Sequence, residues 1–106
     1  MAVTQAYDKT RNKLLRDPQT AAEYLNTVLE ENNPDALLKA LRNIAEAQAG
    51  GMKGTAESAQ LNRESLYKML SEDGNPRLSS LEALLHTFGL RLAVAVDREH
   101  DQQNCA

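Results

Sequence analysis

The chain has 106 residues, of which 42% are hydrophobic and 25% charged, as expected of one soluble globular domain. This composition excludes collagen-like, low-complexity and mostly disordered chains. No apolar run approaches the roughly 20 residues that cross a bilayer, and the first residues lack the apolar segment of a secretory signal. We therefore expect a cytoplasmic protein without membrane contact. The formal net charge of −3 gives no overall attraction for nucleic acid, so any such site must be local.

Charge is distributed unevenly and divides the chain into three predicted parts. Residues 1–16 carry four basic and one acidic residue with few apolar positions, which indicates a basic N-terminal arm containing a short helical turn at most. Residues 17–96 hold most apolar positions and form the predicted domain. Residues 97–106, with one basic and three acidic residues, are expected to be an acidic flexible tail. The single Cys105 lies in this tail and cannot close an intrachain disulfide.

Two amphipathic helices are predicted at the start of the domain. The first begins after the candidate N-cap Asp17 and runs to about Glu31, and the second begins at Pro34 and ends at Gly50-Gly51. Apolar residues recur in both at the spacing of one helix face. The two predicted apolar stripes are Ala21, Tyr24, Leu25, Val28 and Leu29, and Leu37, Leu38, Leu41, Ile44 and Ala45.

Two shorter helices, over residues 52–61 and 63–72, are predicted to meet across a tight turn, and Asn62 is the candidate N-cap of the second. The small residues Ala56 and Ala59 allow the second helix to cross closely, and Leu66 locks it against the first. This is the arrangement that a helix-turn-helix requires. The turn position where glycine is usual holds Gln60, which requires a strained or altered turn.

The outward side of the second short helix carries the candidate DNA contacts. In a recognition helix the N-terminal residues reach base edges, while capping and first-turn groups hold phosphates. An arginine pairs with guanine, a glutamate accepts from cytosine, and a lysine donates to guanine or phosphate. Glu64 has an alternative role as an acid that stabilises the first turn of its helix. The candidates that the packing leaves outward are Arg63, Glu64, Tyr67 and Lys68.

A fifth helix and one strand complete the predicted domain. Ser79 or Ser80 is the expected cap of the helix, Gly89 closes it, and residues 91–96 then alternate as in a β-strand. A lone strand leaves its backbone groups unpaired, so we expect it to pair with the same strand of a second copy. The fold class is therefore mainly α, with four to five helices containing a helix-turn-helix and one C-terminal strand paired across a homodimer. The interface residues are Leu92, Val94 and Val96.

Several stretches in combination resemble a known protein family. The matching stretches are residues 21–26, 40–45, 62–71, Gly74-Asn75-Pro76 and Leu90-Arg91-Leu92. Over about residues 17–96 the chain resembles addiction-module antidote proteins of the HigA type. The resemblance implies an Xre-like helix-turn-helix antitoxin of a type II toxin-antitoxin module. Such a protein binds and neutralises a RelE-like toxin that cleaves messenger RNA, and represses their shared operon as a dimer or as the complex.

The resemblance also implies roles for the candidate residues. Bases would be read by Arg63, Glu64 and Lys68, while Asn62, Ser65 and Tyr67 would contact phosphates or flanking positions. The sequence departs from the family pattern at Gln60 and at the extra glycine of Gly50-Gly51.

Two surfaces compete as the toxin-binding site. RNA-cleaving toxins are typically basic, so an acidic surface on the first two helices would complement one. Its candidate residues are Glu23, Glu30, Glu31 and Asp35. The basic arm, with Lys9, Arg11, Lys13 and Arg16, would instead contact DNA backbone or an acidic patch of the toxin. The sequence leaves both open.

Catalytic and metal sites are not expected. The candidate nucleophiles Ser58, Ser65 and Cys105 have no histidine near them in the sequence, and neither His86 nor His100 has a second ligand at metal-binding spacing. We therefore expect no enzyme, metal or cofactor. Two alternatives to the antitoxin stay open. One is a helix-turn-helix regulator of the prophage type without a toxin partner, and the other is a helical protein-interaction module that does not bind DNA.

Overall fold

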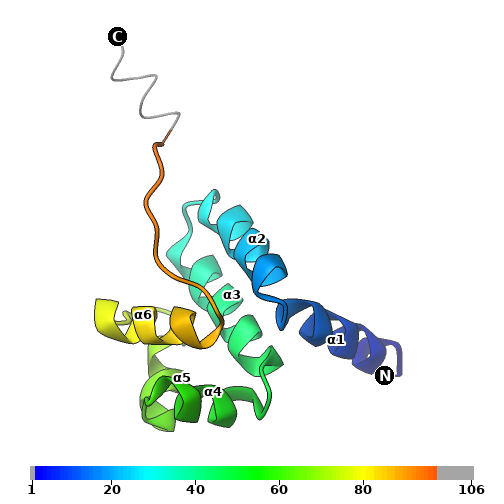
Figure 1. The fold of residues 1–106 in the computed structure, drawn as a ribbon. Helices are drawn as coiled ribbons and strands as arrows, with labels where there is room; N and C mark the ends of the chain where they lie inside the picture. Colours follow the sequence, from blue (N-terminus) through cyan, green and yellow to red (C-terminus); the bar gives the residue numbers. More distant parts are fainter. Residues whose placement is uncertain (1, 98–106) are drawn as a thin grey trace.

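The computed structural model describes residues 2–97, with side chains from Lys9 onward, and these residues form six helices (Figure 1). The mainly α class is confirmed, but the predicted number of four to five helices is wrong. None of the helices in this part of the chain is both long and apolar enough to cross a membrane. The helices are α1 (Ala2–Leu15), α2 (Pro18–Leu29), α3 (Pro34–Ala47), α4 (Gly51–Ala59), α5 (Arg63–Met69) and α6 (Leu78–Thr87).

The additional helix is α1, which replaces the short turn expected in residues 1–16. Leu15, at its end, is buried in the core, and α1 packs against α3 and α2. Directly after α1, the Nε of Arg16 donates a 2.6 Å hydrogen bond to the carbonyl of Ala47 at the end of α3. Most helical stability in proteins comes from such tertiary packing, which a local pattern with few apolar positions does not reveal. From Arg98 on, the predicted acidic tail lies outside the described residues.

The starts of α2 and α3 have the expected capping chemistry. The carboxylate of Asp17 accepts a 3.1 Å hydrogen bond from the backbone N–H of Thr20, which confirms the predicted N-cap. Asn33 does the same for α3, because its side-chain oxygen accepts from the N–H groups of Asp35 and Ala36. A proline at the first position of each helix has a backbone angle suited to a helix start and lacks the N–H that would be unpaired there.

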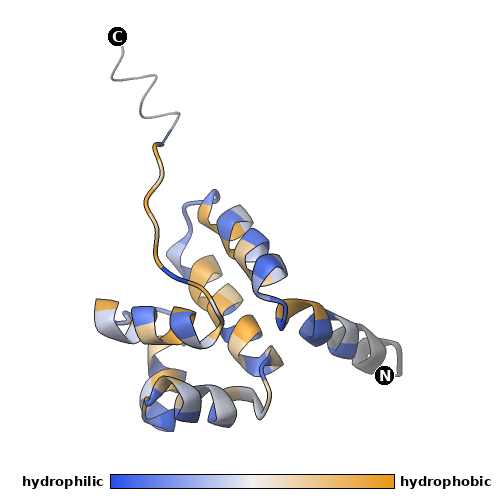
Figure 2. Ribbon diagram, viewed as in Figure 1, coloured by the Kyte–Doolittle hydropathy of each residue, from blue (hydrophilic) through white to orange (hydrophobic). Residues whose placement is uncertain are grey.

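The core is organised around α3 and α4. α3 packs against α1, α2 and α4, and α4 in turn contacts α5 and α6. Figure 2 shows that hydrophobic and hydrophilic positions alternate along the helices, and the buried hydrophobic residues form one cluster. One predicted core residue is wrong, because Leu29 is 50% exposed at the end of α2. The largest apolar side chains that are fully buried are Leu41, Ile44, Leu66, Leu70 and Leu84.

The C-terminal segment, residues 90–97, is not a strand. It follows Gly89, whose φ of 80° ends α6, and leads away from the helices (Figure 1). The first residue of the segment is bound to α6, because the N–H of Leu90 donates a 2.8 Å hydrogen bond to the carbonyl of Leu85. Residues 2–97 contain no strand that could exchange backbone hydrogen bonds with it, so the predicted C-terminal strand is wrong in this single chain. Three of its apolar side chains are exposed, namely Leu92, Val94 and Val96.

Candidate nucleic-acid interface

Two short helices, α4 and α5, form the predicted pair. They are joined by residues 60–62, and α4 also packs against α3 and α6. Ala56 and Ala59 are buried on α4, and Leu66 is buried on α5 with no exposed surface. These burials confirm the sequence-based interpretation that small residues on one helix allow close approach of the other. The pair therefore holds α5 rigidly against the core by its inner side.

The turn between α4 and α5 contains the expected unusual backbone. Gln60 has φ 57° and ψ 40°, in the left-handed region, which costs an ordinary residue about 1–2 kcal/mol. This geometry lets the N–H of Leu61 donate a 2.9 Å hydrogen bond to the carbonyl of Ala56. Two glycines at the start of α4 also have positive φ, 80° at the N-cap Gly50 and 61° at the first helical residue Gly51, and they turn the chain between α3 and α4.

All six predicted DNA-contacting residues are exposed on α5 or at its N-cap. Asn62 is confirmed as the N-cap, because its side-chain oxygen accepts hydrogen bonds from the N–H of Glu64 at 2.8 Å and of Ser65 at 3.3 Å. Arg63 and Tyr67 lie one turn apart, and the Arg63 Cζ is 5.7 Å from the centre of the tyrosine ring. This cation–π geometry holds both side chains on one side of α5.

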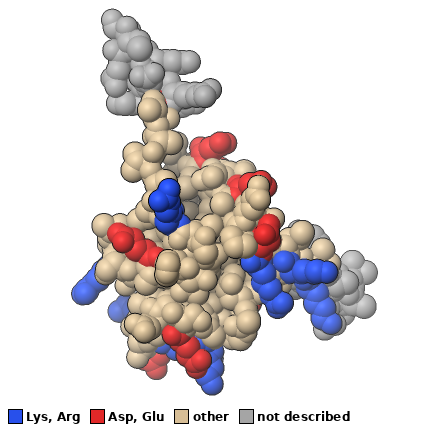
Figure 3. Space-filling model, viewed as in Figure 1, with Lys and Arg blue, Asp and Glu red and all other residues tan. Residues whose placement is uncertain are grey.

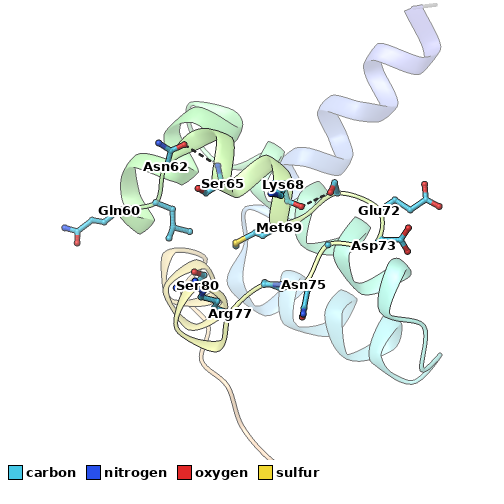
Figure 4. Close-up of a pocket in the computed structure, with 14 residues that line it drawn as sticks. Gln60, Asn62, Ser65, Lys68, Met69, Glu72, Asp73, Asn75, Arg77 and Ser80 are labelled. Atoms are coloured by element: carbon cyan, nitrogen blue, oxygen red, sulfur yellow. Dashed lines mark hydrogen bonds between the residues drawn. The ribbon is translucent and has the colours of Figure 1, made fainter.

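A hollow of about 900 Å³ borders the other side of α5 and separates it from the start of α6 (Figure 4). Three of the six predicted residues line it, namely Asn62, Ser65 and Lys68. Arg63, Glu64 and Tyr67 do not. The structure thus divides the six residues into one group beside the hollow and another outside it. Opposite α5, the hollow is lined by Asn75, Arg77 and Ser80.

The start of α6 supplies site residues that the sequence analysis missed. The N-cap of α6 is Arg77 in extended conformation, and no side chain caps the helix. The predicted caps Ser79 and Ser80 are therefore wrong, because both lie within the first turn. Uncapped N–H groups and the helix dipole make such an end favourable for an anion. The sequence signal was Pro76. It forces Asn75 out of helical conformation, so no helix can continue through Asn75 and the next one begins after it.

The predicted acidic surface is only partly clustered. Glu30, Glu31 and Asp35 lie at the connection between α2 and α3, whereas Glu23 lies further back on α2. All four are exposed, and Asp35 accepts a 3.3 Å hydrogen bond from the backbone N–H of Asp73. Figure 3 shows basic side chains gathered over α1 and acidic ones over α2.

The part of the chain that the structure describes contains no group of three or more His, Cys, Asp or Glu side chains that could hold a metal ion. His86 lies in α6, while His100 and Cys105 are outside the described residues.

Comparison with known proteins places this fold in a family. A family model described as "Probable addiction module antidote protein" matches residues 4–96, which include nearly all of α1 and every residue of the α5 surface. The chain belongs to this antidote family. An "Uncharacterized protein" of Haemophilus influenzae (strain ATCC 51907 / DSM 11121 / KW20 / Rd) is 37% identical over 75 residues, which are 71% of this chain and 75% of that protein. No solved structure matches this antidote protein.

Proposed function

We propose that this antidote protein is a HigA-type antitoxin of a type II toxin-antitoxin module, with α4 and α5 as an Xre-like helix-turn-helix. In this proposal it binds and neutralises a RelE-like toxin in the cytoplasm. It also binds double-stranded DNA of its own operator as a homodimer and represses the operon. Membership of the antidote family supports the antitoxin role and suggests a toxin partner.

The observation that carries the DNA-binding proposal is the exposed outer side of α5 beside a hollow. The charged residues that line this hollow are two basic ones, Lys68 and Arg77, and two acidic ones, Glu72 and Asp73. Arg63 extends from the N-terminal turn, where a recognition helix contacts base edges, and its stacking on Tyr67 limits the conformations it must give up on binding. Lys68 and Arg77 face one hollow from two helices, an arrangement suited to a phosphate. Glu64 is exposed in the first turn of α5, a position compatible both with accepting from a cytosine and with stabilising the helix start.

The test is fluorescence anisotropy on duplex DNA from upstream of the gene, against a scrambled duplex, over a salt series. We expect the native duplex to bind about 10³-fold or more tightly near physiological salt. Arg63→Ala should remove about 1–3 kcal/mol of that preference. Lys53→Ala, at an exposed position near the start of α4, is the matched control, since it removes the same charge at a residue with no predicted base contact. Equal binding of both duplexes, or an unchanged preference in Arg63→Ala, would reject the recognition-helix role.

For the toxin, the exposed carboxylates at the α2–α3 connection support an electrostatic contact with a basic protein. Glu30→Lys with Glu31→Lys should weaken capture of the toxin encoded beside the gene. The matched variant reverses two charges on α1, with Lys9→Glu and Lys13→Glu. A loss of capture with the α1 variant alone would assign the toxin to the basic surface instead.

The homodimer is supported by the exposed apolar side chains after α6. Val94 is 101% exposed and Val96 75%, which is unusual for apolar residues of a monomer in water. We expect Val94→Asp to reduce the mass in sedimentation equilibrium from dimer to monomer. An unchanged mass would remove this segment from the interface.

A second candidate function is a protein-interaction module that has the fold without DNA binding. The observation in its favour is the balance of charge around α5, because residues 50–96 contain five basic and five acidic side chains. A regulator of the prophage type without a toxin is the third possibility. The anisotropy experiment separates the module from both DNA-binding proposals, and toxin capture separates the two DNA-binding proposals from each other.

A further inference from the structure

A groove of about 570 Å³ between α1, α2 and α3 has no role in the functions proposed above. Its floor is hydrophobic, and Leu14 within it is 55% exposed. The hydroxyl of Tyr24 is held at its wall by a 3.0 Å hydrogen bond from the side-chain amide of Asn43. Apolar surface gathered in a concave site indicates a binding surface. The apolar lining consists of Leu14, Leu15, Tyr24, Val28 and Ala36.

We infer that this groove receives residues 91–96 of a second copy of the chain. The inference rests on the homodimer proposed above and names the surface that holds it. Leu92 is 46% exposed, Val94 101% and Val96 75%, so both the segment and the groove gain from removing apolar surface from water. If each copy inserts its segment into the other, both contacts form around one twofold axis.

The dimensions of segment and groove agree. Thr20, Tyr24 and Val28 line the groove at intervals of four residues along α2, a distance of about 12 Å from first to last at the helical rise. An extended chain covers about 13 Å from Leu92 to Val96 at the rise of a strand. Leu92, Val94 and Val96 therefore extend along the length of α2 that forms the groove.

The charges are also complementary. The charged residues lining the groove are Arg11 and Lys39, both basic. The sequence that follows the apolar segment is acidic, with three acidic residues and one basic residue over 97–106. An inserted segment would therefore bring its acidic sequence toward the basic side chains of the groove.

The path of the chain favours a second copy over the chain's own segment. Gly89 lies against Pro18 at the start of α2, where an added Cβ would be 3.2 Å from the proline Cγ, so this point fixes where the segment leaves the core. From there Figure 1 shows the segment running away from α1, which forms one wall of the groove. Its own groove is reached only if the chain reverses direction.

The first test compares two leucines of similar exposure in the full-length protein. Leu14 in the groove is 55% exposed and Leu29 outside it is 50% exposed, so neither Leu14→Asp nor Leu29→Asp should unfold the monomer. We expect Leu14→Asp to raise the dimer Kd at least about tenfold in sedimentation equilibrium. The Leu29→Asp control should leave it unchanged. Equal effects of the two variants, or no effect of Leu14→Asp, would overturn the proposal that the groove binds the segment. If circular dichroism shows Leu14→Asp unfolded, Lys39→Glu at the exposed rim replaces it with the same expectations.

The second test locates the segment directly. A benzophenone is attached at Val96→Cys in a Cys105→Ser background, and isotopically light and heavy copies are mixed before irradiation. We expect cross-links between copies that map to residues 11–43. Cross-links between copies at residues 91–96 would leave the dimer standing and overturn the groove. Cross-links only within one copy would overturn the exchange between copies. A monomer at all concentrations would overturn the dimer as well.

Discussion

The hydroxyl of Thr55 on α4 donates a 2.8 Å hydrogen bond to the backbone carbonyl of Ala45 on α3, in the protein interior. Thr55 is 1% exposed, so this bond forms without competition from water. It sets the position of α4 on α3. Because α5 packs on α4, the same bond contributes to the placement of the surface proposed to contact DNA.

Thr55→Val should therefore lower the free energy of unfolding by about 1–2 kcal/mol, because it keeps the volume and removes the donor to a buried carbonyl. Urea denaturation measures the change. Thr27→Val is the control, since the Thr27 hydroxyl bonds to the Glu23 carbonyl at an exposed position. A loss in Thr27→Val as large as that in Thr55→Val would contradict the importance of the buried bond.

Gln60→Gly should stabilise the protein by about 0.5–1 kcal/mol. The left-handed backbone at φ 57° is strained for glutamine and free for glycine, and the gain exceeds the extra entropy that glycine loses on folding. Thermal denaturation should show a higher Tm. The matched control Ser58→Gly, at an exposed right-handed position of α4, should instead lower it. A lower Tm in both variants would show that the glutamine is not strained.

Asn62→Ala should cost about 1 kcal/mol, because the N–H groups of Glu64 and Ser65 lose their capping acceptor. Since Asn62 begins α5, hydrogen exchange should increase first in the amides of that helix. Asn26→Ala, at an exposed position of α2, removes the same group without removing a cap and should not lower stability, because alanine is the better helix former. Uniform destabilisation without faster exchange in α5 would argue against a local capping effect.

Arg77→Ala should weaken binding to native and scrambled DNA by the same factor, because a phosphate contact carries no sequence information. The slope of log K against log salt should fall by about one unit. This pattern differs from that expected for Arg63→Ala, which changes the preference between duplexes. Lys53→Ala, at an exposed position of α4 outside the hollow, is the control. A change of sequence preference in Arg77→Ala would place this side chain at a base edge.

Features that depend on neighbouring residues could be predicted from the sequence. Asp17 and Asn62 were predicted as caps, and Gln60 as an unusual turn residue, because capping and turn geometry depend on groups within three or four residues. The apolar spacing that placed Leu66 inside also placed four of the six candidate DNA contacts outside, since a helix has one fixed period.

Features that depend on distant residues were decided by the tertiary structure. α1 is a full helix packed on α3 and α2, although its local sequence has few apolar residues. The hollow beside α5 is lined by both Lys68 and Arg77 because α5 and α6 each pack on α4, and the sequence contains no signal for that proximity. Residues 91–96 have the alternation of a strand but no partner strand within residues 2–97. Periodicity reports which side of an element is apolar, whereas packing and pairing depend on the surfaces that the rest of the chain brings to it.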